Sequence, residues 1–295
     1  MSNTAVQSKQ AISWWSDFNA LVKLRLSSTV VFSSVMAYLI ALNGAVSLVN
    51  LLILASGGFF VTAAANILNE VLERDFDKLM KRTADRPLAA GRMDISNAVL
   101  IAGLMVLVGI TLLALFNPAT SLLGTFALVS YAFMYTPMKR VSTAAVTVGA
   151  IAGALPTLIG CVAAEGRVSL LGVSLFAIQF FWQYTHFWSI AYLGFEDYRQ
   201  AGYQFLPQKN GKIGRTVGVQ AFVFALALVP VAIVPYYLGE TGLVSAAAVS
   251  VLSLVFAYFA WNFYQQFNRK SALRLMFSSF VYIPIALLIY YFDKL

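Results

Sequence analysis

The sequence predicts an all-α membrane protein with nine transmembrane helices, and three features of the chain support that fold class. Its 295 residues are 60% hydrophobic and 11% charged, whereas a soluble domain has about 25% charged residues. Several apolar runs reach the roughly 20 residues that a helix needs to cross a bilayer. These runs are continuous and do not alternate with a period of two, which excludes an outer-membrane β-barrel. The basic residues, finally, are concentrated on alternate connections between the runs.

The apolar runs define the expected helices and the expected domain. We predict membrane spans at residues 27–44, 51–70, 97–116, 119–137, 143–163, 169–193, 215–237, 243–263 and 274–292. No linker or short repeat interrupts them, so residues 1–295 are predicted to form a single multi-pass membrane domain. Residues 1–25 lack the apolar core of a cleavable signal peptide. A helix lying in the membrane interface is predicted there instead, with a disordered tail as the alternative, because one helical face would carry Ile12, Trp15, Phe18 and Val22.

The Lys and Arg residues predict the orientation of the helices. If the N-terminus is cytoplasmic, 18 of them lie in cytoplasmic segments, and only Arg167 and Lys294 lie outside. We therefore expect a protein of the cell (inner or plasma) membrane with a cytoplasmic N-terminus and an outside C-terminus. Its two long loops, about 71–96 and 194–214, would be cytoplasmic. The net charge of +8 follows from this topology and indicates no nucleic-acid partner.

One amide and two carboxylate side chains at the end of the second span form a regularly spaced column, which we call the acidic ladder. Asn69, Glu73 and Asp77 are four residues apart, so a helix places all three on one face over about 12 Å. Hard oxygen ligands of this kind suit Mg²⁺, which proteins hold through one or two carboxylates together with substrate phosphates. Asp75 points to the opposite side and is not expected to be a ligand. Glu70 flanks the ladder, and its role stays open.

Basic residues follow the ladder directly. Lys81, Arg82 and Arg86 beside a Mg²⁺ site would bind a polyanion such as a diphosphate. A solvated helix end that carries cytoplasmic positive charge is the alternative. An allylic diphosphate that ionises in such a site leaves a carbocation, while the metal and the basic residues stabilise the charge on the leaving diphosphate. Prenyl transfer inside a membrane is therefore the predicted chemistry.

Cys161 is the only cysteine of the chain, and His186 is its only histidine. A lone cysteine predicts neither a disulfide nor a thiolate metal site, and Cys161 is expected to pack as a small apolar residue. His186 lies well within the sixth apolar run, where ionisable residues are rare and usually face a cavity. It is predicted to act there as a ligand or as an acid or base, with a packed, hydrogen-bonded histidine as the alternative.

Five motifs occur in the order found in one family of intramembrane prenyltransferases. They are MKRTADRPLAAGR (Met80–Arg92), YTPMKR (Tyr135–Arg140), GAIAGALP (Gly149–Pro156), FWQYTHFW (Phe181–Trp188) and EDYRQAGYQFLP (Glu196–Pro207). The first contains R-T-x-x-R-P-L and the fourth W-Q-x-x-H-F, and this pair is specific. Together with the ladder, the motifs resemble the heme O synthases, or protoheme IX farnesyltransferases, which belong to the intramembrane prenyltransferases that alkylate aromatic acceptors.

The resemblance implies a reaction and further site residues. The nine helices would surround a central cavity capped by the cytoplasmic loops. The enzyme would join the farnesyl group of farnesyl diphosphate to a vinyl group of heme b with addition of water, giving heme O and diphosphate. Heme would be a substrate, which His186 would coordinate or orient through its imidazole, and Mg²⁺ would be the cofactor. A heme A synthase or a terminal oxidase would be a candidate assembly partner. Substrate-binding residues would include Lys139, Arg140, Trp182, Gln183, Glu196 and Asp197, and the last two would also bind metal.

The chain departs from that family's pattern at several positions. Glu73 stands where many relatives have Asp, and only Glu196–Asp197 remains of a second motif that is often Asp-x-x-x-Asp, so the second Mg²⁺ site stays open. Thr157, Cys161 and Ala145 replace a Pro, a Trp and an Asn that are common in the family. Local contacts to heme are therefore expected to differ.

Two other functions compete with heme farnesylation. A prenyltransferase that acts on a quinone or chlorophyll precursor would share the ladder but not the W-Q-x-x-H-F context of His186. An ion-coupled transporter would need acidic residues at mid-membrane in broken helices. Here no Asp or Glu lies in the middle of a predicted span, and the acidic residues lie at one cytoplasmic rim.

Overall fold

The computed structural model describes residues 13–295, and helices make up nearly all of its regular structure. Eight of them are long and apolar enough to cross a membrane, which makes the chain a multi-pass membrane protein. Each overlaps one predicted span. They are α2 (Leu24–Ala41), α3 (Leu48–Asp77), α4 (Ile95–Ala114), a stretch of α5 (Pro118–Val129), a π-helical segment (Ser130–Tyr135) and α6 (Thr136–Met138), α7 (Ala145–Glu165), a stretch of α10 (Thr216–Ala232) and α11 (Val234–Tyr237), α12 (Leu243–Gln266) and α13 (Arg269–Phe292).

The remaining predicted span, 169–193, coincides with α8 (Leu170–Leu193). At 24 residues it is as long as α12 and α13. It is not among the eight membrane-competent helices, and Gln179, Gln183 and His186 lie within it. α8 packs against α7, α10 and α13, so its polar side chains lie inside the helical bundle or at its seams. This ninth long helix therefore carries polar groups into the bundle.

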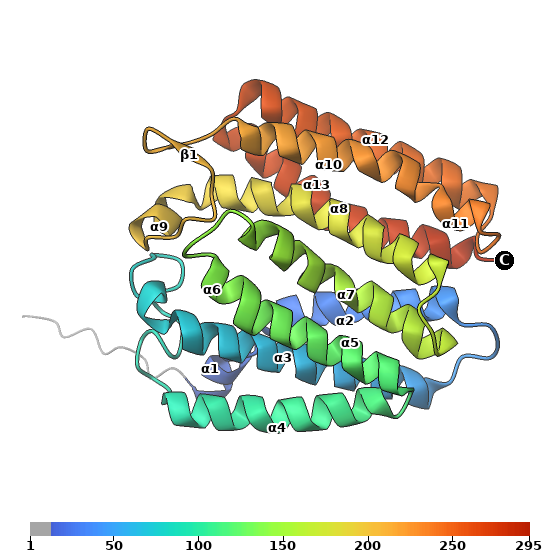
Figure 1. Ribbon diagram of the computed structural model, residues 1–295, viewed down its shortest axis with the longest axis horizontal. Helices are drawn as coiled ribbons and strands as arrows, with labels where there is room; N and C mark the ends of the chain where they lie inside the picture. The colour runs from blue at the N-terminus through green and yellow to red at the C-terminus, as the bar shows by residue number, and fades with distance from the viewer. Residues whose placement is uncertain (1–12) are drawn as a thin grey trace, which may run out of the picture.

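The short elements gather at one end of the bundle. Figure 1 shows α1 (Trp14–Leu21), α9 (Phe195–Gln200) and the hairpin of β1 (Gln208–Lys209) and β2 (Lys212–Ile213) at the same end as the connection between α3 and α4. The C-terminus lies at the opposite end. α3 continues as helix to Asp77, so the acidic ladder is helical and the loop that we predicted from residue 71 begins only at residue 78.

The N-terminal segment is helical where the structure describes it. Ser13 caps α1 by accepting a hydrogen bond from the backbone of Ser16. Trp14 and Trp15 are exposed, as an interfacial helix requires, whereas Asp17 is buried and accepts hydrogen bonds from Arg92. Ile12, which we placed on the apolar face of this helix, lies outside the described residues.

Glycines set the closest helix contacts. A side chain at Gly160 of α7 would collide with the backbone of Ser34 and Tyr38 in α2, and one at Gly109 of α4 would collide with the side chain of Val61 in α3. Small residues allow such close approach between membrane helices. The neighbouring Cys161 is buried against α2, which confirms its prediction as a packed residue. These contacts fix α2, α3 and α7 around the site described next.

Candidate functional site

A polar chamber of about 210 Å³ lies at the end of the bundle where the short elements gather. It brings together residues from α3, from the connections 78–94 and 139–144, and from the segment around α9. Its lining contains four basic and two acidic side chains, so its own charge is positive and suits an anionic ligand. The charged and polar members are Lys23, Asn69, Glu73, Asp77, Arg82, Arg86, Lys139, Tyr131, Tyr135, Tyr198 and Tyr203.

The acidic ladder forms one wall of this chamber. Asn69, Glu73 and Asp77 share the inner face of α3, and their exposed fractions are 2%, 3% and 0%. Asp75 points outward, as the helical spacing predicts, and pairs with Arg74 and Lys78 at the surface. The three ladder residues therefore face the chamber, whereas Asp75 faces the surface.

A basic side chain from a different segment meets each rung of the ladder. Lys23, which precedes α2, donates to Asn69 Oδ1 at 3.1 Å. Lys139, which follows α6, forms an ion pair with Glu73. Arg86 contacts Asp77 Oδ2 at 2.7 Å. Three parts of the chain that are distant in sequence are thus held together through α3.

The R-T-x-x-R-P-L motif folds back onto α3. Thr83 donates its hydroxyl to the Asp77 carbonyl at 2.9 Å, where α3 ends. The backbone N–H of Leu88 donates to Glu70 Oε1 at 3.2 Å. Glu70, whose role the spacing left open, therefore supports the loop and does not line the chamber. Arg82 reaches across the chamber mouth to the Tyr198 hydroxyl at 3.3 Å.

A π-helical segment (Ser130–Tyr135) forms another wall of the chamber. Such segments often occur at functional sites because the widened turn redirects side chains. Tyr131 and Tyr135 both line the chamber. Thr136 accepts a hydrogen bond from Asn69 Nδ2 at 3.0 Å and donates to the Tyr131 carbonyl. Hydrogen bonds from this wall therefore orient the first rung of the ladder.

The loop after α8 closes the chamber. The carbonyl of Lys139 accepts the backbone N–H groups of Gln204 and Phe205 at 2.9 and 3.1 Å. Tyr198 and Tyr203 from this loop line the chamber together with Phe205. The Lys139 amine lies 4.8 Å from the ring centre of Tyr135 and 5.5 Å from that of Tyr203, within the range of cation–π attraction.

Burial alters the titration of the two chamber lysines. It lowers the pKa of Lys23 to about 7, with the charge of Arg86 as the next cause. Burial also lowers the pKa of Lys139, and the charge of Glu73 opposes that shift. Both amines are therefore poorly solvated, and a bound anion would stabilise their charged forms.

An apolar chamber of about 140 Å³ continues from the polar one toward the centre of the bundle. Leu26 and Tyr131 line both chambers and mark their junction. Its walls come from α2, α3, α5 and α7, and its polar groups include Asn66 and Gln183. A smaller cavity of about 40 Å³ shares Val30, Val61, Thr62, Ala127 and Pro156 with it. The cavities form a series that is polar at the rim and apolar within.

The structure does not bring every predicted residue into the polar chamber. Lys81 is exposed outside it. Arg140 packs 3.8 Å over the ring of Phe76 and bonds the Leu72 carbonyl, so it buttresses the outer side of α3.

Glu196 and Asp197 also lie outside the chamber. Glu196 is exposed on α9 and forms an ion pair with Arg199 one turn later. The same short helix turns Tyr198 inward in their place. These two acids, which we predicted as metal and substrate ligands, therefore do not face the ladder in this structure.

The W-Q-x-x-H-F motif splits between two sides of α8. Gln183 lines the apolar chamber and donates to the Gly149 carbonyl at 3.4 Å. Trp182 donates its indole N–H to the Ser279 carbonyl of α13 at 2.8 Å. Its ring stacks on His186 with 5.0 Å between ring centres and 9° between planes. Trp182 and Gln183, which we predicted as substrate-binding residues, therefore lie in two adjacent environments.

Ser279 fixes the tautomer of His186. The histidine Nδ1 lies 2.6 Å from Ser279 Oγ, and Ser279 donates its own proton to the Met276 carbonyl. Both contacts are satisfied as hydrogen bonds when Nδ1 donates to Ser279 Oγ, and that arrangement leaves the lone pair on Nε2. With this lone pair, His186 can act as a ligand or as a hydrogen-bond acceptor.

The donors of the ladder fit a hard cation only with help from a ligand. No group of three or more His, Cys, Asp or Glu side chains is close enough to hold a metal among residues 13–295. The ladder offers two carboxylates and one amide oxygen, and the Oδ1 atom of Asp77 is buried without a hydrogen-bond partner in the described chain. This donor set matches Mg²⁺ held jointly by a protein and by substrate phosphates.

Sequence reasoning missed several residues of the chamber. Lys23 was counted only toward topology, although only Arg25 among the basic residues lies between it and the first long apolar run. Tyr198 and Tyr203 lay within a matched motif, but tyrosine is common throughout the chain. Thr136 carries no charge to single it out. Their function depends on contacts with α3 that no local pattern reveals.

Residues 30–282 match the UbiA prenyltransferase family. The chain is 41% identical to a protoheme IX farnesyltransferase of Cytophaga hutchinsonii, over 93% of this chain and 96% of that protein. It is 38% identical to the protoheme IX farnesyltransferase of Christiangramia forsetii, over 100% of this chain and 98% of that protein.

Solved structures share the fold. A digeranylgeranylglyceryl phosphate synthase superposes with a TM-score of 0.78 at 17% identity, over 95% of this chain and 98% of that one. A UbiA homolog from Archaeoglobus fulgidus, bound to GPP and Mg²⁺, superposes with a TM-score of 0.71 at 14% identity, over 92% of this chain and 99% of that one.

Proposed function

The chain belongs to the UbiA prenyltransferase family, and we propose that it transfers the farnesyl group of farnesyl diphosphate to a vinyl group of heme b. Water adds to the same vinyl group, and heme O and diphosphate are the products. The full-length similarity to protoheme IX farnesyltransferases supports this choice of substrates. The single observation in the structure that carries the proposal is a polar, positively charged chamber that opens into an apolar one.

The diphosphate binds in the polar chamber. Lys23, Lys139 and Arg86 now contact the oxygens of the ladder, and each can turn to a phosphate oxygen when the anion enters. Arg82 stands at the mouth and adds a further cation. Charge-assisted bonds of this kind strengthen as negative charge collects on the leaving group, so they favour cleavage of the carbon–oxygen bond.

Mg²⁺ would be held by Asn69, Glu73 and Asp77 together with the diphosphate, where it would supply further positive charge to the leaving group. The buried, unpartnered Oδ1 of Asp77 supports this assignment. Glu196 and Asp197 do not face the chamber, so one cation at the ladder is the simplest metal content.

The farnesyl chain extends into the apolar chamber. Tyr131 lines the junction of the two chambers, so the carbocation that forms when the diphosphate leaves would lie beside its ring, whose face attracts a cation. The π electrons of the vinyl group then form the new carbon–carbon bond. The positive charge passes to the carbon next to the macrocycle, water attacks that carbon, and a proton is lost.

Heme reaches this junction from the side of α8. Gln183 faces the apolar chamber, while His186, three residues later, faces α13. A wide, flat acceptor can contact both, with its iron near His186 and a vinyl edge near the chamber. The lone pair that Ser279 leaves on Nε2 favours iron ligation over a role as a proton donor.

The orientation follows from α8 as a ninth span. An odd number of spans puts the two termini on opposite sides of the membrane. The uneven distribution of Lys and Arg then supports a cytoplasmic polar chamber and N-terminus and an outside C-terminus, in the cell membrane. The whole chain would act as a single domain, and its product would pass to a heme A synthase or a terminal oxidase.

The test is incubation of the purified protein with heme b, farnesyl diphosphate and Mg²⁺, followed by mass spectrometry of the porphyrin. The expected product gains a farnesyl group and a hydroxyl group. Unchanged heme together with prenylated 4-hydroxybenzoate in a parallel reaction would reassign the acceptor to a quinone precursor. A variant that lacks both ladder carboxylates, Glu73→Gln with Asp77→Asn, is the negative control.

A further inference from the structure

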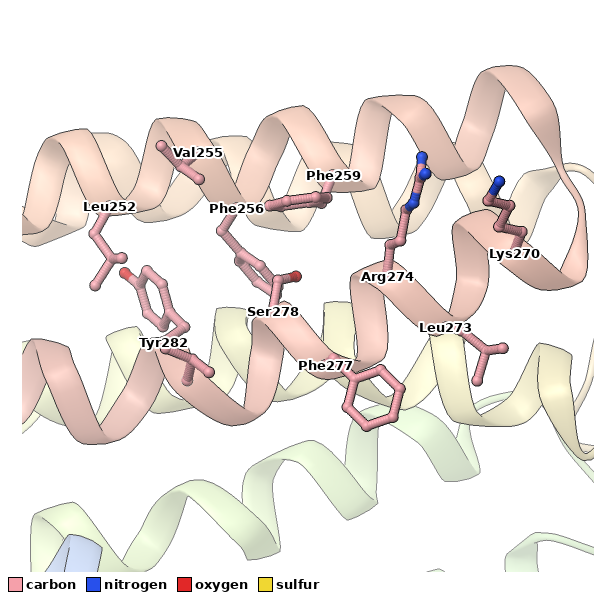
Figure 2. A pocket seen from close by; sticks show the side chains of 11 residues that line it. Leu252, Val255, Phe256, Phe259, Lys270, Leu273, Arg274, Phe277, Ser278 and Tyr282 are labelled. Atoms are coloured by element: carbon pink, nitrogen blue, oxygen red, sulfur yellow. The ribbon is translucent and has the colours of Figure 1, made fainter.

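A further cavity, separate from the two chambers, lies on the outer face of the bundle. It is a groove of about 570 Å³ between α12 and α13. Figure 2 shows Leu252, Phe256 and Tyr282 toward one end of it and Lys270 and Arg274 toward the other. None of its lining residues lines the polar or the apolar chamber. Phe277 and Val281 on its rim are 59% and 53% exposed, so the groove is open to the surroundings of the protein.

The two cations of the groove share one face of α13, because Lys270 and Arg274 are four residues apart. Figure 2 shows Arg274 extending from α13 toward α12 beside Phe259, with Lys270 one turn nearer the connection between the helices. Neither side chain forms an ion pair in the part of the chain that the structure describes. Both are exposed. Their charges are therefore available to a ligand in the groove.

The local sequence offers these cations no neutralising partner. Residues 243–292, which form α12, α13 and their connection, contain three basic side chains and no Asp or Glu. The loops around the polar chamber differ, because there Arg86, Arg92 and Lys139 each pair with a carboxylate. A cytoplasmic excess of positive charge accounts for basic residues at this end of the hairpin. That excess of charge does not explain why two of the basic residues, Lys270 and Arg274, border an apolar groove.

The length of the groove matches one leaflet of a bilayer. From Lys270 to Tyr282 the helix advances 12 residues, or about 18 Å at 1.5 Å per residue. Half of the hydrocarbon core of a bilayer is about 15 Å thick. With Lys270 and Arg274 at headgroup depth, the other end of the groove therefore lies near the middle of the membrane.

We propose that this groove binds one anionic phospholipid of the cytoplasmic leaflet. Its phosphate contacts Lys270 and Arg274, and one acyl chain lies against Phe256, Phe277 and Val281. Arginine pairs well with phosphate oxygens, and basic pockets between membrane helices attract anionic headgroups. A zwitterionic lipid brings its own cation to the same place, where the two basic side chains repel it. The groove thus selects by headgroup charge.

The test compares lipid binding by wild-type protein and by Lys270→Gln with Arg274→Gln. Delipidated protein in neutral detergent is titrated with phosphatidylglycerol or phosphatidylcholine of identical chains, and bound lipid is counted by native mass spectrometry. We expect one phosphatidylglycerol to bind wild-type protein at least tenfold more tightly than phosphatidylcholine. The double variant is expected to lose that preference. Inorganic phosphate, added alone, should not compete at equal concentration, because it lacks the chain that fills the groove.

Two further variants separate the site from general charge. Arg269→Gln removes a neighbouring cation that does not line the groove and should keep the preference. Val281→Trp fills the groove and should weaken the binding of both lipids. Equal binding of the two lipids by wild-type protein, or an unchanged preference in the double variant, would overturn the proposal. Prenyl transfer in the double variant should stay within about twofold of wild type, so failure of the lipid site is distinguishable from failure of the proposed reaction.

Discussion

The guanidinium group of Arg86 lies 2.7 Å from the carboxylate of Asp77, and this ion pair fastens the loop after α3 to the end of the helix. Asp77 is fully buried, and Arg86 is only partly exposed. Removing one partner of such a pair leaves a buried charge without compensation, which typically costs about 3–5 kcal/mol. The pair therefore combines a structural role with the proposed diphosphate site.

We predict that Arg86→Ala destabilises the protein by about 3 kcal/mol and abolishes turnover. Adding Asp77→Asn should restore most of the stability, because the buried charge is then gone, but not the activity. Thermal unfolding in detergent and a heme O assay measure the two effects. A double variant that is as unstable as Arg86→Ala, or one that regains turnover, would contradict this account.

Glu73→Gln should reduce turnover by about 100-fold or more, since it removes a charged oxygen from the ladder and leaves Lys139 unpaired. Asp75→Asn is the matched control, because Asp75 lies on the same turn but points to the surface. Its activity should remain close to wild type. Similar losses in both variants would mean that the acidic turn acts through its general charge and not through the inner face of α3.

Removal of divalent metal should stop turnover without unfolding the protein. Lys23, Lys139 and Arg86 already contact the three rungs of the ladder, so the fold does not depend on a bound cation. We expect chelation with EDTA to eliminate product and Mg²⁺ to restore it, while the melting temperature changes by less than about 2 °C. A large fall in melting temperature on chelation would assign the metal a structural role.

Lys23→Gln should weaken the binding of farnesyl diphosphate more than that of heme. Lys23 faces the polar chamber and contacts Asn69, and loss of one phosphate contact typically raises KM about tenfold. Lys78→Gln removes a surface lysine that pairs with Asp75 and serves as the control. Measuring KM for each substrate distinguishes this result from general misfolding, which would lower kcat without such selectivity.

His186→Ala should change the absorption spectrum of bound heme b, because the proposed iron ligand is lost. Ser279→Ala should reduce heme affinity by about tenfold, since it frees the ring that Ser279 now orients. The matched control is Ser278→Ala, whose hydroxyl bonds only the Leu275 carbonyl of its own helix. A heme spectrum that is identical in His186→Ala and wild type would exclude iron ligation by this residue.

Local patterns in the sequence predicted much of the fold and one wall of the site. Runs of apolar residues located the eight membrane-competent helices, since the length that crosses a bilayer is a property of each segment alone. The period of the α-helix placed Asn69, Glu73 and Asp77 on one face and Asp75 on the other. These conclusions depend on spacing within one helix and need no knowledge of its neighbours.

The rest of the site required the tertiary structure, because it depends on which segments meet. Glu196 and Tyr198 lie on one short helix, and only the packing of α9 decides that the tyrosine, not the acid, faces the ladder. Packing against α13 likewise separates His186 from Gln183 and sets its tautomer through Ser279. The sequence by itself determined the helices, their spacing and the chemistry of the ladder. Tertiary contacts alone decided that Lys23 and Lys139 join Arg86 at the ladder, because charge pairing between distant segments leaves no periodic trace along the chain.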